Sequence, residues 1–160
     1  MPAIIYQNKN NNIIYKIEHS ETIPSEPYFL DCDEDSFLLQ GDYPQNNLMI
    51  LDNNNNIFTK ELYPVVTQDA EGIILMQAYL NKEALNLSLN TGYAHYFSRS
   101  RNRLWKKGEE SGHLQKVNSI FYNNDFKFYV YSVEQISNAC HTGSYSCFFR
   151  KVIDGKIYTL

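Results

Sequence analysis

The fold of this chain is constrained most strongly by the turn-forming residues that interrupt its apolar runs. Asparagine clusters at residues 8–12 and 53–56, and the Gly41-Asp42 pair, separate short runs of aliphatic and aromatic residues. Because asparagine, aspartate and glycine readily adopt turn conformations, this pattern predicts short strands joined by tight loops. We therefore expect a β-rich α+β fold, built as a single domain from hairpins and one main helix.

Local signals place these elements. Residues 65–76 hold two apolar runs around an Asp-Ala-Glu-Gly turn, and residues 117–133 hold two aromatic and β-branched runs around Asn123-Asn124-Asp125. Each segment is predicted to form a hairpin. Between them, Asn81 can cap a helix and Gly92 can end it.

The bulk properties of the chain narrow its class. Its 160 residues are 43% hydrophobic, which suffices for a core, and its net charge of −4 gives no general reason to expect nucleic acid as a partner. No apolar run approaches the ~20 residues that span a membrane, and residues 1–12 do not resemble a signal peptide. The odd count of three cysteines suits a reducing compartment, so we predict a cytoplasmic protein.

The cysteines are the first candidates for chemistry. Cys140, His141 and Cys147 lie within eight residues, and Gly143 permits a sharp loop between them. Together with Cys32, the only other cysteine, Cys140 and Cys147 could form a catalytic zinc site with one open position. His141 as a fourth ligand would instead make a sealed structural site, and spacing alone also allows two buried cysteines beside a surface loop.

An acidic stretch surrounds Cys32, between strand-like runs at residues 28–30 and 37–39. Its carboxylates would repel one another unless a cation lay between them, and their oxygens suit magnesium or calcium. A solvated acidic loop is the alternative. The acidic residues are Asp31, Asp33, Glu34 and Asp35.

A basic stretch could bind a phosphorylated nucleotide. Residues 94–101 alternate as in a strand, which would place Ser98 and Ser100 on one face and Arg99 and Arg101 on the other. A solvated basic hairpin edge is the alternative, and a lone tryptophan is more often a core anchor than a base-stacking platform. The candidate substrate-binding residues are Ser98, Arg99, Ser100, Arg101, Trp105, Lys106, His113 and Gln115.

Read together from about Tyr63 to Arg150, these segments resemble the phosphoribosyl-AMP cyclohydrolase family of histidine biosynthesis. Several ordered motifs carry the resemblance, which makes it far more specific than any one of them. They are Gln68-Asp69, residues 76–81, residues 95–101, residues 104–108, residues 111–115, residues 133–135 and the stretch from Cys140 to Cys147.

The resemblance implies an intertwined homodimer, zinc held by cysteines across the subunit interface, and magnesium near an aspartate cluster. It also implies hydrolysis that breaks the N1–C6 bond of the adenine ring of phosphoribosyl-AMP. By position, Cys140 and Cys147 would be zinc ligands, His141 would handle protons, and Arg99, Arg101 and Lys106 would contact substrate phosphates.

One departure from the family pattern is large. The family's Asp-Cys-Asp-x-Asp motif belongs where this chain has residues 123–127, of which only Asp125 is retained. The same pattern occurs at residues 31–35, which suggests that an N-terminal β-rich extension, residues 1–62, delivers Cys32 as the third zinc ligand and Asp31, Asp33 and Asp35 to magnesium. A cyclohydrolase-like domain would follow at residues 63–160. Coincidence is the alternative.

The sequence alone therefore leaves three functions open. The first is an active cyclohydrolase whose ligand loop has moved. The second is a catalytically inactive relative that only binds nucleotides, and the third is a protein-interaction module stabilised by a structural zinc.

Overall fold

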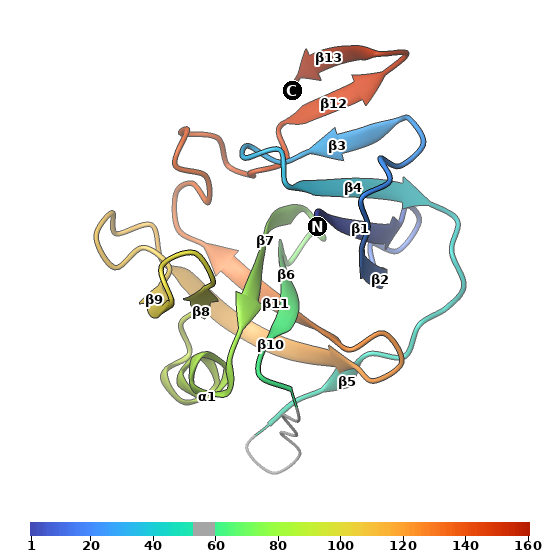
Figure 1. The fold of residues 1–160 in the computed structure, drawn as a ribbon. Coiled ribbons are helices and arrows are strands. Elements are labelled where there is room, and N and C mark those ends of the chain that lie inside the picture. Colours follow the sequence, from blue (N-terminus) through green and yellow to red (C-terminus); the bar gives the residue numbers. More distant parts are fainter. Residues whose placement is uncertain (53–59) are drawn as a thin grey trace.

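The computed structural model describes residues 1–52 and 60–160, which form three β-sheets and a single α-helix (Figure 1). The asparagine cluster at residues 53–56, predicted as a loop, lies outside these residues. The cluster at residues 8–12 follows β1 and forms the predicted turn into β2. A β-rich single domain with one helix is thus confirmed for the described part of the chain.

The first sheet combines residues from near both termini. Its strand order is β13–β12–β3–β4–β1–β2, with β1 and β4 parallel and the other neighbours antiparallel. The C-terminal hairpin therefore pairs with a strand from the first thirty residues. The strands are β1 Ala3–Asn8, β2 Ile14–His19, β3 Tyr28–Leu30, β4 Ser36–Gly41, β12 Arg150–Ile153 and β13 Lys156–Thr159.

The second sheet holds five strands in the order β5–β10–β11–β6–β7, with β6 and β11 parallel. They are β5 Met49–Ile50, β6 Tyr63–Asp69, β7 Ile74–Leu80, β10 Gln115–Asn123 and β11 Phe128–Gln135. The helix α1, Lys82–Thr91, leads into a small third sheet of β8, His95–Ser98, and β9, Arg103–Lys106.

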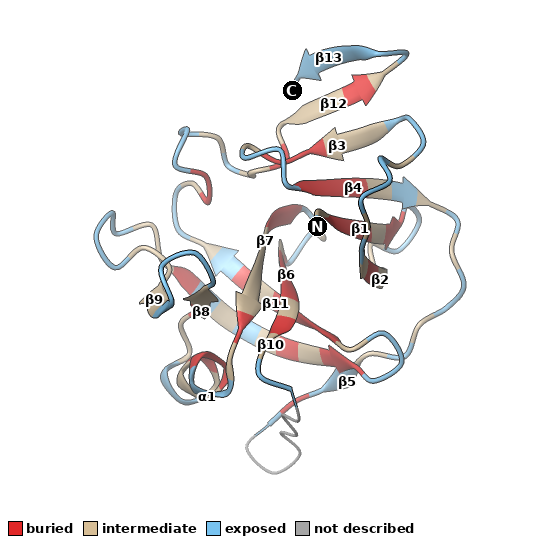
Figure 2. Ribbon diagram, viewed as in Figure 1, coloured by how far each residue is buried: buried red, intermediate tan, exposed pale blue. Residues whose placement is uncertain are grey.

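The second sheet is the middle layer of the molecule. Alternate side chains of a strand point to opposite faces, and here both faces are apolar. Val65 and Tyr129 enter the core that also holds Leu85 of α1, whereas Val66 and Val130 enter the core shared with the first sheet. The strands of this layer accordingly carry many buried residues (Figure 2).

The predicted local elements are confirmed. The two hairpins are β6–β7 and β10–β11, and the runs on either side of the acidic stretch pair as β3 and β4. Asn81 caps α1, because its Oδ1 accepts a hydrogen bond of 2.8 Å from the backbone N–H of Ala84. Gly92 ends the helix in the left-handed conformation at φ 78°.

The division at residue 62 stays a prediction. Strands from either side of it share both large sheets, since β12 pairs with β3 and β5 pairs with β10. Over the described ranges, no helix has the length and apolar character needed to cross a bilayer.

Candidate metal and nucleotide site

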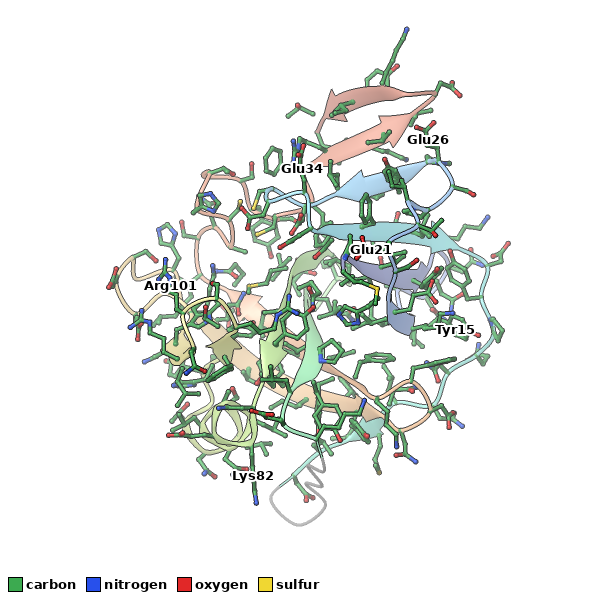
Figure 3. The ribbon with its side chains drawn as sticks, in the orientation of Figure 1. Tyr15, Glu21, Glu26, Glu34, Lys82 and Arg101 are labelled. Atoms are coloured by element: carbon green, nitrogen blue, oxygen red, sulfur yellow. The ribbon has the colours of Figure 1, made fainter. Side chains whose placement is uncertain are left out.

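The turn between β3 and β4 positions Cys32 (Glu34 of this turn is labelled in Figure 3). Asp31 organises it, because its Oδ1 accepts hydrogen bonds from the backbone N–H groups of Asp35 and Ser36, at 3.0 and 3.2 Å. An aspartate that bonds its own backbone in this way favours a turn over an extended strand. Glu34 completes the turn in the left-handed conformation at φ 61°.

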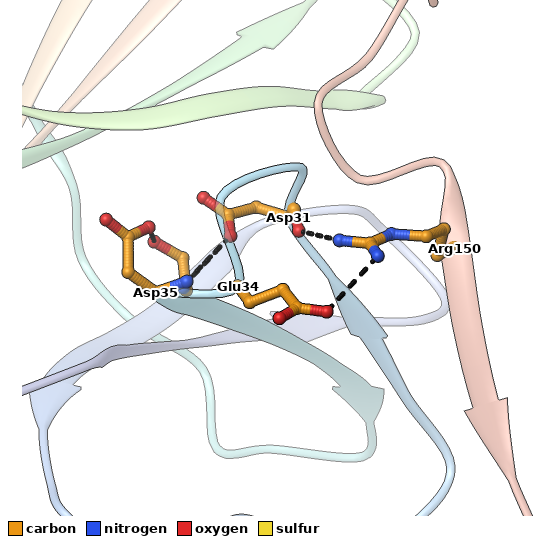
Figure 4. A network of polar contacts seen from close by, with 5 residues as sticks. Asp31, Glu34, Asp35 and Arg150 are labelled. Carbon is orange, nitrogen blue, oxygen red and sulfur yellow. Dashed lines mark hydrogen bonds and ion pairs between the residues drawn. The ribbon is translucent and has the colours of Figure 1, made fainter. Parts of the chain in front are cut away.

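Arg150 holds this turn from the other end of the chain. Its Nη2 donates to the backbone oxygen of Asp31 at 2.6 Å, and its Nη1 lies 3.3 Å from Oε1 of Glu34 (Figure 4). Because β12 pairs with β3, the guanidinium is brought directly to the turn. No sequence pattern predicted this contact, because Arg150 and Asp31 are 119 residues apart in the chain.

The loop between β11 and β12 brings in the other thiols. Its backbone folds back on itself, with the N–H of Cys140 bonded to the carbonyl of Ser144 and that of Gly143 to the carbonyl of Cys140. Gly143 has φ 95°, so the sharp loop predicted at this glycine is confirmed. The N–H of Cys147 bonds to the carbonyl of Leu75, which anchors the loop to β7.

These two segments bring donor atoms together. The ligand atoms of Cys32, Cys140 and His141 all lie within 4.8 Å of one another and could hold a metal ion. Cys147, the third predicted zinc ligand, is outside that group, but it lies close enough to Cys140 for the two thiols to perturb each other's pKa. The structure thus gathers all three cysteines of one chain, and it adds the imidazole of His141 beside them.

The thiols perturb one another. Burial, followed by the hydrogen bond and charge of Cys140, raises the pKa of Cys32 to about 12. Burial and the charges of the same neighbours raise the pKa of Cys147. Burial alone would raise the pKa of Cys140 too, but hydrogen bonds from Thr142, Cys32 and Cys147 outweigh it and lower that pKa. Crowded thiols of this kind gain from a soft divalent cation, so the donor set fits a metal.

The carboxylates predicted to bind magnesium lie in the same turn as Cys32, but their oxygen atoms do not form a convergent group like that of Cys32, Cys140 and His141. Asp31, Asp33 and Asp35 line one cavity of about 740 Å³. Burial, a hydrogen bond with Asp35 and the charge of Asp35 raise the pKa of Asp31 to about 7. Within residues 1–52 and 60–160, the only group of three or more convergent His, Cys, Asp or Glu donors is the one at Cys32, so the magnesium site stays a prediction.

Most of the predicted substrate-binding residues face two adjoining cavities. One, of about 550 Å³, is lined by His141 together with Arg101, whose side chain extends from the β8–β9 turn (Figure 3). The other is the cavity of the acidic turn. Residues that line both are Asp33, Ser98, Ser100 and Trp105; Lys106 lines the first, and Arg99 lines the second.

The strand predicted through Arg101 is wrong in its second half. β8 ends at Ser98, and a turn follows in which Asn102 adopts a left-handed conformation at φ 50°. Arg99 and Arg101 therefore do not share one strand face, and they line different cavities. Local alternation could not reveal this, because the β8–β9 pairing ends one residue before the arginines begin.

Two other candidates lie away from these cavities. Gln115 is fully buried, where it donates to Gln135 at 2.8 Å and accepts a hydrogen bond from the hydroxyl of Tyr96. His113 is half-buried at the turn before β10, and its carbonyl accepts from Gln135. Neither residue lines the two cavities described above, so their roles in binding stay predictions.

Comparison with known proteins decides the family. The model of the phosphoribosyl-AMP cyclohydrolase family matches residues 76–149. A phosphoribosyl-AMP cyclohydrolase of Leptospira interrogans serovar Lai is 50% identical over 137 residues, which cover 82% of this chain and 71% of the relative. This chain belongs to the phosphoribosyl-AMP cyclohydrolase family.

Other members of the family are similar over a shorter stretch. A phosphoribosyl-AMP cyclohydrolase of Methanospirillum hungatei is 57% identical over 99 residues, 61% of this chain and 75% of the relative. A histidine biosynthesis bifunctional protein of Wolinella succinogenes is 55% identical over 92 residues, 57% of this chain and 40% of the relative. The Leptospira match is longer, and at 82% of the chain it spans Cys32 whichever end it starts from.

Residues 123–127 and Cys32 lie at different distances from Cys140 within one chain. The segment that departs from the family motif, residues 123–127, forms the turn before β11, whereas Cys140 follows the other end of that strand (Figure 1). The eight residues of β11 extend roughly 25 Å at about 3.3 Å per residue. A cysteine at position 124 could not reach Cys140 of the same chain, but Cys32 does.

A glycine of the family's motifs, Gly108, lines the cavity of about 550 Å³ that His141 also lines. Gly108 has φ 80°, and a Cβ there would lie 2.4 Å from the backbone carbon of His113. We expect Gly108→Ala to lower the free energy of unfolding by about 2–4 kcal/mol, because left-handed strain and overpacking against backbone add up. Gly112→Ala is the matched control, with the same φ but open space, and should cost only about 1 kcal/mol. Equal losses in urea unfolding would contradict the steric argument.

Proposed function

We propose that this chain is a zinc-dependent phosphoribosyl-AMP cyclohydrolase that opens the adenine ring at the N1–C6 bond in histidine biosynthesis. Family membership supports the reaction, and one observation of the structure supports the metal. Cys32, which comes from the N-terminal segment, meets Cys140 and His141 beside a cavity whose lining includes Arg101 and Lys106. The departure at residues 123–127 therefore does not deprive the chain of a third thiol.

The donor set suits zinc. Cys32, Cys140 and Cys147 would hold it, which leaves a fourth position open as in catalytic zinc sites. Zinc when bound supplies a Lewis acid that makes hydroxide available near neutral pH. The exposed His141 lines the adjoining cavity and is free, in this arrangement, to hold or move a proton at the reacting atoms.

Residues of the chain also bind and orient the substrate in this proposal. Arg101 and Lys106 line the cavity of His141 and would bind phosphate oxygens. Trp105 packs against Tyr96, with ring centroids 5.0 Å apart, and lines both cavities with the rest of its surface. Trp105 would thus serve both as a core anchor and as a surface that faces the base, the two roles that were alternatives from the sequence alone.

Magnesium, the homodimer and the cytoplasmic location stay predictions. Asp31, Asp33 and Asp35 would hold magnesium in the cavity that they line. A small phosphorylated nucleotide is the expected partner, and the interface implied by the family resemblance would add a second copy of the chain. The inactive relative and the structural-zinc module remain alternatives, and neither is favoured by the relatives.

The test is a spectroscopic assay of phosphoribosyl-AMP ring opening alongside metal analysis of the purified protein. We expect steady turnover with about one zinc per chain. After chelation, circular dichroism should stay native while turnover stops, because three sheets and two apolar cores do not depend on the metal. A zinc-free protein that is folded and inactive when isolated, and that zinc does not activate, would contradict the proposal.

A further inference from the structure

A third cavity, separate from the thiol cluster, gathers positive charge. It measures about 280 Å³, and its charged and titratable lining residues include His19, Lys60, Arg99 and Lys127. Among the described residues that line it, none is an aspartate or a glutamate. We call it the basic pocket.

Four separate segments build the basic pocket. His19 ends β2, Lys60 precedes β6, Arg99 follows β8, and Lys127 ends the turn before β11. The positive charges of Lys60, Arg99 and Lys127 repel one another, and an anion would relieve that repulsion. For Arg99 and Lys127, the described part of the chain contains no carboxylate within ion-pair distance.

Tyr79 fixes two of these groups. Its hydroxyl lies 2.8 Å from Nε2 of His19, and the guanidinium carbon of Arg99 lies 3.6 Å from the centre of its ring. Burial, and then the positive charges of Arg99, the amino terminus and Lys60, lower the pKa of His19. Tyr79 therefore holds the side chains of both His19 and Arg99 in place in the basic pocket.

The basic pocket is continuous with the proposed active site. Tyr79 and Arg99 line both it and the cavity of the acidic turn, which in turn shares Trp105 with the cavity of His141. Arg101, Arg103 and Lys106 line that last cavity. The cavity of the acidic turn thus shares lining residues with both the basic pocket and the cavity of His141, and those two cavities each carry cationic groups.

We propose that the basic pocket binds one of the two phosphate monoesters of a phosphoribosyl nucleotide, while the cations around Arg101 bind the other. This inference rests on the proposed function. Phosphoribosyl-AMP carries a phosphate on each of its two ribose units, so its charges lie at opposite ends with the base between them. His19 and Lys60 come from outside residues 76–149, and Lys127 occupies a position where the family motif has acidic residues.

The first experiment needs no turnover. Ribose 5-phosphate is titrated into the full-length protein while the imidazole resonances of His19 are followed by NMR. We expect a saturable shift, and Lys127→Gln should weaken the affinity about 10-fold, as for the loss of one charge-assisted contact. Lys82→Gln is the matched control, because Lys82 lies on α1 and does not line the basic pocket (Figure 3). No shift at His19, or equal affinity in Lys127→Gln and Lys82→Gln, overturns the proposal.

The second experiment separates this inference from the proposed function. With phosphoribosyl-AMP as substrate, His19→Gln and Lys127→Gln should raise KM about 10-fold and change kcat much less. Normal turnover with an unchanged KM in both variants would contradict phosphate binding in the basic pocket and would leave the proposed cyclohydrolase activity unaffected. The opposite outcome is a protein that never opens the ring but whose His19 resonances shift with ribose 5-phosphate, with a lower affinity in Lys127→Gln. That outcome would support the basic pocket and contradict the proposed function.

Discussion

Cys32→Ser should lower the affinity for zinc at least about 100-fold and remove most of the ring-opening activity at equal zinc concentration. The reason is that Cys32 supplies a donor that no other described residue can replace, since Cys140 and Cys147 are the only other cysteines in the chain. Serine keeps the size of the side chain but offers a hydroxyl that binds zinc far more weakly than a thiolate. Zinc titration with a chromophoric chelator and the ring-opening assay measure the two effects.

A control in the same turn separates ligand loss from a disturbed loop. Glu34→Gln removes the exposed carboxylate that pairs with Arg150 but leaves Cys32 and the bond from Arg150 to the carbonyl of Asp31 in place. An exposed ion pair contributes about 0–1 kcal/mol, so this variant should retain zinc and activity. A zinc-loaded and fully active Cys32→Ser would refute the relocated ligand, and an inactive Glu34→Gln would point to the turn itself.

His141→Asn should lower kcat by about 10²–10⁴-fold while one zinc per chain is retained. His141 is exposed and lines the substrate cavity, as a residue that exchanges protons with a bound molecule must. Asparagine preserves the polar shape of the side chain but cannot take up a proton near neutral pH. Stopped assays of ring opening, with metal analysis of the same sample, measure both quantities.

The position of His141 within the donor group gives this variant a second use. Its ring nitrogen lies within 4.8 Å of the sulfur atoms of Cys32 and Cys140. If His141→Asn loses its zinc, the imidazole is a ligand and the site is closed in the manner of structural zinc. Retained zinc with a pH profile of kcat that has lost one limb would establish the proton-handling role instead.

Much of this fold could be predicted because its signals are local. The cap at Asn81, the stop at Gly92 and the two main hairpins depend on residues a few positions apart, and the structure confirms them. The loop from Cys140 to Cys147 likewise carries its donors and its turn-forming Gly143 in one short stretch.

What escaped prediction depends on residues distant in the chain. Arg150 reaches the turn at Asp31 only because β12 pairs with β3, and no sequence pattern specifies that pairing. Gln115 lies in a family motif, yet its side chain is bonded within the core. The basic pocket is a third example, since His19 and Lys127 belong to turns and strand ends that become neighbours only in the folded chain.

The pairing of β12 with β3 also sets an order for folding during synthesis. Residues 28–35, which contain Cys32, leave the ribosome early, but their neighbour strand and the guanidinium of Arg150 come more than a hundred residues later. Segments fold as their partners emerge. Strand β3, which leads into the turn, therefore lacks its neighbour β12 until residues 150–153 are outside the ribosome tunnel. We therefore expect the nascent chain to carry Cys32 as an unprotected thiol, and metal to be taken up only after residues 140–153 have emerged.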